Sequence, residues 1–139
     1  MRAPASRTIF IPKTAATHAH RLAYLEWGNP ASTPVFCMHG LTRNAHDFDF
    51  LAERLAANYR VICPDMAGRG QSEPLPDPAA YHYGTYVSDM LFLIRELGIS
   101  KAHWIGTSMG GITGMMLANA APGLLASLAL NDIGCVVSA

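Results

Sequence analysis

The chain has 139 residues, half of them hydrophobic, with 10 Lys and Arg balancing 10 Asp and Glu. This length fits one domain with its own buried core, the apolar content excludes a disordered chain, and the zero net charge gives no electrostatic footprint for binding nucleic acid. Only 14% of the residues are charged, against about 25% in an average soluble domain, so charge is scarce on this chain.

Two short strands are predicted at the start of the chain, over residues 8–11 and 21–27. Pro12 stops the first strand, and the turn sequence Gly28-Asn29-Pro30 ends the second. We expect the two strands to form an antiparallel lead-in to the rest of the sheet.

Strands and helices alternate from residue 35 onward. Strands are predicted at residues 35–39, 60–63, 102–106 and 125–130, and helices at residues 49–58, 86–97 and 109–120. Asp47 or Asp49 favours the start of the first helix, while Thr85 and Gly98 are expected to cap and stop the second. The Pro-rich segment 67–84 is expected to run over the surface as a loop.

This alternation predicts an α/β fold, with a doubly wound, mostly parallel sheet and helices on both faces. No internal repeat or low-complexity stretch divides residues 1–139, so we expect no internal domain boundary. The run between Lys101 and Asp132 contains no charged residue, which on its own suggests a membrane helix. Glycines and a proline break this run into pieces, so buried strands and a helix are favoured and no membrane span is expected.

The three cysteines, Cys37, Cys63 and Cys135, are too few and too odd in number for a disulfide framework. Cys37 and Cys63 lie in apolar strands, where each is expected to be a small buried side chain. Free thiols indicate a reducing compartment, and the basic N-terminus has no apolar stretch long enough for a signal peptide. A cytoplasmic location is therefore expected.

The pentapeptide Gly106-Thr107-Ser108-Met109-Gly110 is a G-x-S-x-G sequence between a predicted strand and a predicted helix. That setting is required for a nucleophile elbow, a tight turn that presents a serine at the carboxyl end of a sheet. Gly106 and Gly110 lack the Cβ that would crowd the turn, and the helix N-terminus supplies N–H donors for an oxyanion. Ser108 is the candidate nucleophile; the alternative is a serine that only packs in a Gly-rich turn.

The tripeptide His39-Gly40-Leu41 comes at the end of the predicted strand 35–39. Such a loop can turn the backbone N–H of Leu41 toward the nucleophile, where it would complete a two-donor oxyanion hole with the N–H of Met109. His39 precedes the nucleophile in the chain, so we favour a role in ordering this loop through its ring hydrogen bonds over a role as general base.

The segment 65–72, DMAGRGQS, resembles a phosphate-binding loop only at first sight, because it lacks the Lys-Ser/Thr ending and the G-x-G-x-x-G spacing. A turn fits better, with Asp65 capping nearby N–H groups and Gly68 and Gly70 in left-handed conformations.

Two further clusters are open to more than one interpretation. His46, Asp47 and Asp49 lack the spacing of a zinc site and are expected to be capping and solvated side chains, so no metal or other cofactor is expected. Four residues around the start of the second helix either line a substrate entrance or pack the loop: Tyr81, His82, Tyr83 and Tyr86.

The ordered set HGL (39–41), DMAGRGQS (65–72), GTSMGG (106–111) and LALNDIG (128–134) resembles the α/β-hydrolase superfamily. Within it, the chain is similar to small bacterial lipase- and esterase-like hydrolases, a group that also includes carbon–carbon bond hydrolases. The resemblance implies the first six strands of the α/β-hydrolase fold, without its lid and C-terminal strands. It also implies Ser108 as the nucleophile and the Leu41 and Met109 amides as the oxyanion hole. The family's dehalogenases and epoxide hydrolases have an aspartate where this chain has Ser108.

The catalytic triad of this family runs in the order Ser, then Asp or Glu, then His. After Ser108 the chain contains one acid, Asp132, and no histidine. A serine hydroxyl without a base is a poor nucleophile at neutral pH. We expect residues 1–139 to be the N-terminal part of a longer hydrolase domain, the alternative being a short protein that has lost catalysis. Asp132 is either the triad acid or a turn-capping residue.

The first functional hypothesis is a serine hydrolase in which Ser108 attacks an ester or related carbonyl compound and forms an acyl-enzyme. The alternatives are a carbon–carbon bond hydrolase with the same nucleophile and a non-catalytic small-molecule receptor on the same fold. The expected partners are a small-molecule substrate and the remaining C-terminal part of the protein, in the same or a separate chain, and a homo-oligomer is compatible with the sequence. Expressed alone, residues 1–139 are expected to be insoluble, because strand 125–130 becomes an exposed apolar edge.

Overall fold

The structure is a computed structural model that describes residues 3–15, 17–134 and 136. Its strands are β1 (Ala5–Ile11), β2 (His20–Trp27), β3 (Thr33–Met38), β4 (Tyr59–Pro64), β5 (Ala102–Thr107) and β6 (Leu125–Asn131). Its α-helices are α1 (Asp49–Leu55), α2 (Tyr83–Glu96) and α3 (Met109–Ala120), and two short 3-10 helices are η1 (Ala45–Phe48) and η2 (Pro78–Ala80). None of the helices among these residues is long and apolar enough to cross a bilayer.

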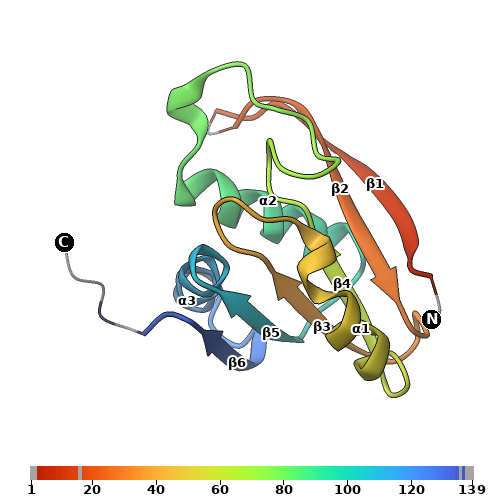
Figure 1. The fold of residues 1–139 in the computed structure, drawn as a ribbon. Helices are drawn as coiled ribbons and strands as arrows, with labels where there is room; N and C mark the ends of the chain where they lie inside the picture. Colours follow the sequence, from red (N-terminus) through yellow and green to blue (C-terminus); the bar gives the residue numbers. More distant parts are fainter. Residues whose placement is uncertain (1–2, 16, 135, 137–139) are drawn as a thin grey trace.

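All six described strands belong to one sheet, in the order β1-β2-β4-β3-β5-β6 (Figure 1). β1 pairs antiparallel with β2, and β2 pairs antiparallel with β4. β3 lies between β4 and β5 and is parallel to both, and β6 is parallel to β5. The predicted antiparallel lead-in and mostly parallel α/β sheet are therefore confirmed.

Alternate residues of the central strands face two separate cores. Phe36 and Ile62 point to the side covered by α2 and α3, where the Phe36 ring stacks on Trp104 at 5.7 Å between centroids. Cys37 and Cys63 point to the other side, toward α1. This period of two along each strand is why the strands read as unbroken apolar runs, since both faces of the sheet are covered. The prediction that Cys37 and Cys63 are buried is confirmed, and Cys135 lies outside the described residues.

Element boundaries differ from prediction in several places. β1 starts three residues earlier than predicted, and α1 ends at Leu55 after a preceding 3-10 turn whose first N–H groups are capped by Asn44. The prediction that Thr85 caps the second helix is wrong. α2 starts at Tyr83, and the His82 ring accepts from the Thr85 N–H, while the Thr85 hydroxyl donates to the Ala80 carbonyl at 2.7 Å.

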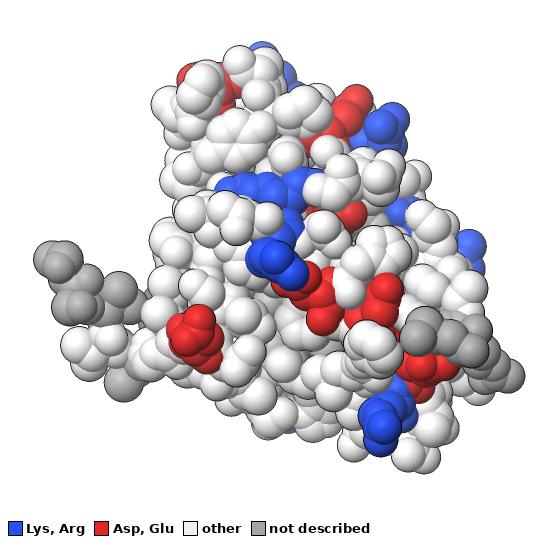
Figure 2. All heavy atoms as spheres, viewed as in Figure 1, with Lys and Arg blue, Asp and Glu red and all other residues white. Residues whose placement is uncertain are grey.

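The scarcity of charge has a definite location in the fold. Between Lys101 and Asp132 the chain forms β5, α3 and β6 without any Asp, Glu, Lys or Arg. In Figure 2 this side of the molecule is largely white, whereas acidic and basic side chains gather over the loops and α1. β6 is at the edge of the described sheet, and most of its residues are exposed, including Leu130. The insolubility of residues 1–139 expressed alone stays a prediction.

Candidate functional site

The turn between β5 and α3 holds Ser108 in a conformation that side chains rarely adopt. Its φ is 51° and its ψ is −115°, a region that glycine enters freely and other residues enter only under strain. Ser108 directly precedes the first residue of α3, and its side chain caps none of that helix's N–H groups. Its N–H is bound instead by the Asn131 carbonyl of the neighbouring β6, at 2.9 Å. The serine is thus held in a strained turn at the carboxyl end of the sheet.

Gly106 and Gly110 are required by close backbone contacts rather than by positive φ. A Cβ on Gly106 would lie 2.4 Å from the Gly110 carbonyl oxygen, and a Cβ on Gly110 would lie 2.2 Å from the Met38 carbonyl oxygen. The first turn of α3 therefore lies directly against the last residue of β3. The predicted need for glycine on both sides of Ser108 agrees with this geometry.

The loop after β3 lies beside Ser108. A Cβ added to Gly40 would be 3.6 Å from the Ser108 Cβ. His39 is fully buried, its Nδ1 lies 2.7 Å from the Gly40 carbonyl oxygen, and its Nε2 lies 3.0 Å from the Met66 backbone nitrogen. Because the Met66 N–H can only donate, Nε2 must accept and Nδ1 must carry the proton. Burial lowers the pKa of His39, which favours this neutral form.

This hydrogen bond of His39 fixes the direction of the Leu41 N–H. The Gly40 carbonyl and the Leu41 N–H belong to one planar trans peptide, so they point in opposite directions. With the carbonyl held toward the His39 ring, the Leu41 N–H must point away from it. Met109 is the first residue of α3, where backbone N–H groups have no intrahelical acceptor. Both amides predicted as oxyanion donors thus lie on segments that adjoin Ser108.

The segment 65–72 forms the predicted turn. The two carboxylate oxygens of Asp65 accept from the N–H groups of Ala45 and Gln71, at 2.8 and 2.9 Å. Gly68 and Gly70 have φ values of 77° and 53°, and a Cβ on Gly70 would lie 2.2 Å from the Asp65 carboxylate. Asp65 therefore ties this turn to the start of η1, and the segment is a structural support beside the loop of His39.

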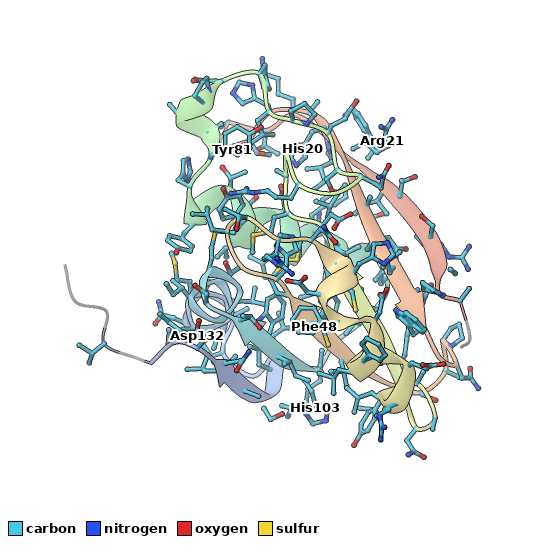
Figure 3. The ribbon with its side chains drawn as sticks, viewed as in Figure 1. His20, Arg21, Phe48, Tyr81, His103 and Asp132 are labelled. Atoms are coloured by element: carbon cyan, nitrogen blue, oxygen red, sulfur yellow. The ribbon has the colours of Figure 1, made fainter. Side chains whose placement is uncertain are left out.

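No histidine among the described residues reaches the Ser108 hydroxyl. His103 on β5 binds the Ser127 hydroxyl at 2.6 Å, and by strand geometry it lies roughly 16 Å before the elbow. His46 pairs with Asp49, and His82 caps α2. Figure 3 shows His20 and His103 at opposite ends of the molecule. Among the described residues, therefore, none of the histidines is placed to act as a general base for Ser108.

Asp132 directly follows β6 and is exposed, with a φ of 57°. Besides Ser108, it is the only other non-glycine residue among those described with a positive φ. Asn131 links it to the elbow, since its carbonyl accepts from Ser108 and its side-chain amide donates to the Thr107 hydroxyl at 3.3 Å. The C-terminal end of strand β6 thus adjoins the turn of Ser108. The role of Asp132 as triad acid stays a prediction.

The clusters left open by the sequence are packed against other residues. Asp47 forms an ion pair with the exposed Arg43, the His46 ring lies 2.8 Å from an Asp49 carboxylate oxygen, and no group of three or more metal-binding side chains occurs in the described ranges. The remaining cluster spans the loop before α2 and the start of that helix, and its tyrosines contact one another and the loop. Tyr83 meets Tyr86 edge-on at 6.2 Å between centroids, and the Tyr81 hydroxyl accepts from the Leu75 N–H at 2.6 Å.

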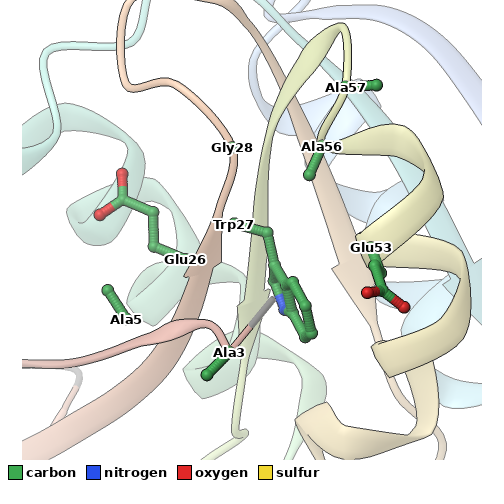
Figure 4. Close-up of a pocket in the computed structure, with 8 residues that line it drawn as sticks. All are labelled: Ala3, Ala5, Glu26, Trp27, Gly28, Glu53, Ala56 and Ala57. Carbon is green, nitrogen blue, oxygen red and sulfur yellow. The ribbon is translucent and has the colours of Figure 1, made fainter. Parts of the chain in front are cut away.

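A pocket of about 430 Å³ lies apart from the elbow, between the start of the chain, the end of β2 and the end of α1 (Figure 4). It is lined by Ala3, Ala5, Glu26, Trp27, Gly28, Glu53, Ala56 and Ala57. None of these residues belongs to the elbow or to the loop of His39. The carboxylate of Glu26 is already paired with Arg60 at 2.6 Å. The pocket therefore contributes nothing to chemistry at Ser108.

A buried ion pair between β2 and α2 was not predicted from the sequence. His20 Nε2 lies 2.7 Å from an Asp89 carboxylate oxygen, and both side chains are 1% exposed. Burial lowers the His20 pKa, but the hydrogen bonds to Asp89 and the His18 carbonyl and the nearby negative charges outweigh it and raise that pKa. Burial also raises the pKa of Asp89. Because both pKa values are raised in the folded protein, the folded pair still binds a proton at pH values where the unfolded chain has released it.

The stabilising contribution of this pair is expected to depend on pH. Since the folded pKa of His20 lies above its unfolded value of 6.5, the contribution is complete below pH 6.5 and is lost as the pH rises through the folded value. The free energy of unfolding of the wild type, relative to Asp89→Asn, should therefore fall as the pH rises above 6.5. Urea unfolding at several pH values measures this difference, and the lowered pKa of His39 is common to both proteins. A difference that is constant with pH would contradict the assignment.

Comparisons with known proteins agree with the observed fold. A family model described as alpha/beta hydrolase fold matches residues 33–137. The chain is 49% identical over 126 residues to a 3-hydroxybutyrate-oligomer hydrolase of Cupriavidus necator, covering 90% of this chain and 43% of that protein. It is 38% identical over 102 residues to a fluoroacetate dehalogenase of a Burkholderia species, covering 71% of this chain and 34% of that protein.

A solved structure gives the same result in three dimensions. An alpha/beta hydrolase from Novosphingobium aromaticivorans superposes with a TM-score of 0.85 at 40% identity, covering 96% of this chain and 46% of the other. The chain thus spans less than half the length of each of these three proteins.

Proposed function

The chain belongs to the α/β-hydrolase family, and on that premise we propose that it supplies the nucleophile and the oxyanion donors of a serine hydrolase. The observation that carries this proposal is the strained φ of 51° at Ser108, in a turn that adjoins Gly40. Strain of this kind costs about 1–3 kcal/mol and is retained where it serves function. A serine that only packed in a turn would have no need of it.

The reaction follows from these groups. The Ser108 oxygen attacks the carbonyl carbon while a histidine takes its proton, and the carbonyl oxygen becomes an oxyanion bound by the Leu41 and Met109 N–H groups. The carbon–oxygen bond to the alcohol then breaks, the histidine returns the proton to the leaving oxygen, and an acyl-Ser108 remains. Water, activated by the same histidine, releases the acid and restores the serine.

An ester or related carbonyl compound is the proposed substrate class. An oligomer of a hydroxy acid, such as the substrate named for the 49% identical relative, joins its units through ester bonds. The fluoroacetate dehalogenase relative suggests a different bond, but the resemblance drawn above implies an aspartate nucleophile in such enzymes. Ser108 therefore favours acyl transfer.

The base must come from outside the described residues. We propose that a histidine, and an acid if Asp132 does not serve, lie in the C-terminal part of the protein, on the same or a separate chain. The hydrolase formed by residues 1–139 with this histidine-bearing part is called the complete hydrolase below. Cys63 offers no substitute nucleophile, because its hydrogen bond with Cys37 and its burial raise the pKa of its thiol well above the usual range.

A fluorophosphonate probe tests this proposal directly, since it reacts with a serine that is activated by a base and an oxyanion hole. We expect peptide mass spectrometry of the labelled complete hydrolase to find the phosphonyl group on Ser108, and no labelling in Ser108→Ala. Labelling of another serine, or none at all, would overturn the proposal. An unlabelled protein that still binds small molecules would point to the receptor alternative.

A further inference from the structure

Arg69 connects three parts of the fold around the loop of Leu41. Its Nε donates to the Leu41 carbonyl at 3.0 Å, and its Nη1 donates to the Ala67 carbonyl and the Tyr86 hydroxyl, each at 2.9 Å. The guanidinium also lies over two tyrosine rings, 5.7 Å from the centroid of Tyr81 and 5.3 Å from that of Tyr86. Tyr86 is buried on α2, so the arginine is held by the fixed body of the domain.

The support on the tyrosine side is itself rigid. Figure 3 labels Tyr81 in the segment that leads to α2, and its hydroxyl is bound by the Leu75 N–H at 2.6 Å. The same hydroxyl lies close to Gly68, where a Cβ would come within 2.7 Å of it. A planar guanidinium that is held by hydrogen bonds and by aromatic faces has little freedom to turn.

Leu41 lies in a turn that is closed by the Arg43 N–H, which donates to the Gly40 carbonyl at 3.2 Å. The Leu41 side chain is 59% exposed, so packing does not fix its backbone. On the side of Gly40 the peptide is held by the His39 ring, and on the side of Thr42 the Leu41 carbonyl is held by Arg69. Together with the turn bond from Arg43, these two bonds fix the peptide planes on both sides of the Leu41 Cα, and therefore its φ and ψ. The direction of the Leu41 N–H depends on both.

We propose that Arg69 is a positioning residue for the oxyanion hole, acting through the Leu41 carbonyl. The inference rests on the proposed function, because it gives the Leu41 N–H its role. Arg69 itself does not touch the reacting atoms in this account. The effect of removing it should appear in the transition state, where the oxyanion exists, and much less in the binding of the ground-state ester.

The test is steady-state hydrolysis of p-nitrophenyl butyrate by the complete hydrolase and its Arg69→Met variant. Loss of one oxyanion donor lowers kcat by about 10²–10³-fold, and a donor that remains but is poorly aimed should cost about 10–100-fold, with KM within about threefold of wild type. Arg43→Met is the matched control, because it removes an equal charge from an exposed arginine of the same loop that pairs with Asp47. Its kcat is expected to stay at the wild-type value.

The outcomes separate this inference from the proposed function. If Ser108→Ala loses activity while Arg69→Met keeps its kcat, Arg69 has no positioning role and the serine mechanism stands. A rise in KM alone, or an equal fall of kcat in Arg43→Met, also overturns the inference. If Ser108→Ala remains active, the proposed function fails first. Should Arg69→Met not fold, Arg69→Lys decides: its single nitrogen cannot bind Leu41 and Tyr86 in the same fork, so wild-type kcat would contradict the proposal.

Discussion

Ser108→Gly is expected to abolish ester hydrolysis and, at the same time, to raise the free energy of unfolding. Removing the nucleophile of a serine hydrolase lowers kcat by a factor on the order of 10⁴–10⁶. The stabilising effect has a separate cause, the φ of 51° and ψ of −115° at Ser108. Glycine adopts this conformation without the strain of about 1–3 kcal/mol that a Cβ brings. Its greater flexibility in the unfolded chain lowers the free energy of unfolding by about 0.5–1 kcal/mol, which offsets part of that effect. A net gain of about 1 kcal/mol is expected.

Ser108→Ala is the control that separates the two effects. Alanine also lacks the hydroxyl but keeps the Cβ, so its activity should be lost to the same degree while its stability stays close to that of the wild type. Urea unfolding of the three proteins and their rates with p-nitrophenyl butyrate provide both measurements. A glycine variant that is no more stable than the alanine variant would show that the strain is absent. An alanine variant with wild-type kcat would remove Ser108 from the mechanism.

The elbow could be predicted from the sequence because its causes are local. Gly106 and Gly110 stand four residues apart across one turn, and an apolar strand precedes them. The start of α2 could not be predicted with the same certainty. Thr85 has the residue type of a good cap, but its hydroxyl donates to the Ala80 carbonyl, and the His82 ring takes the capping position. Residue type alone does not say which of two neighbouring side chains faces the open N–H groups.

The supports of the site depend on contacts between distant parts of the chain. Arg69 lies 28 residues from Leu41, and His20 lies 69 residues from Asp89. Neither spacing matches the period of a helix or a strand. Arg69 meets Leu41 because β3 and β4 are neighbours in the sheet, which brings the loops after these two strands together. The turn at residues 65–72 was predicted from its glycines and Asp65 and is confirmed, but nothing in the sequence assigned a contact to Arg69. The positions of such side chains follow from topology rather than from local pattern.

Gly110→Ala is expected to destabilise the protein strongly, although helix propensity alone predicts the opposite. Alanine is favoured over glycine inside a helix by about 1 kcal/mol, and Gly110 is the second residue of α3. However, the added Cβ would lie 2.2 Å from the Met38 carbonyl oxygen and 2.8 Å from that of His39. These are backbone atoms, so no side-chain rotation relieves the clash. Either α3 or the end of β3 must move, and overpacking of this kind costs about 1–3 kcal/mol, occasionally more.

The same displacement should lower activity, because the two segments that would move carry Ser108 and the His39 loop. Gly134→Ala is the control, since a Cβ there would meet no atom of the described residues within 4 Å, and its stability should change by less than about 1 kcal/mol. Helix propensity predicts that Gly110→Ala raises the free energy of unfolding, and the backbone clash predicts that it lowers it, so urea unfolding distinguishes the two by the sign of the change. A gain in stability would mean that α3 does not lie against β3 as closely as described, and the contact between the elbow and the loop of Leu41 would lose its basis. A loss of about 1–3 kcal/mol or more together with a lower kcat would tie the packing of the two segments to the chemistry proposed for Ser108.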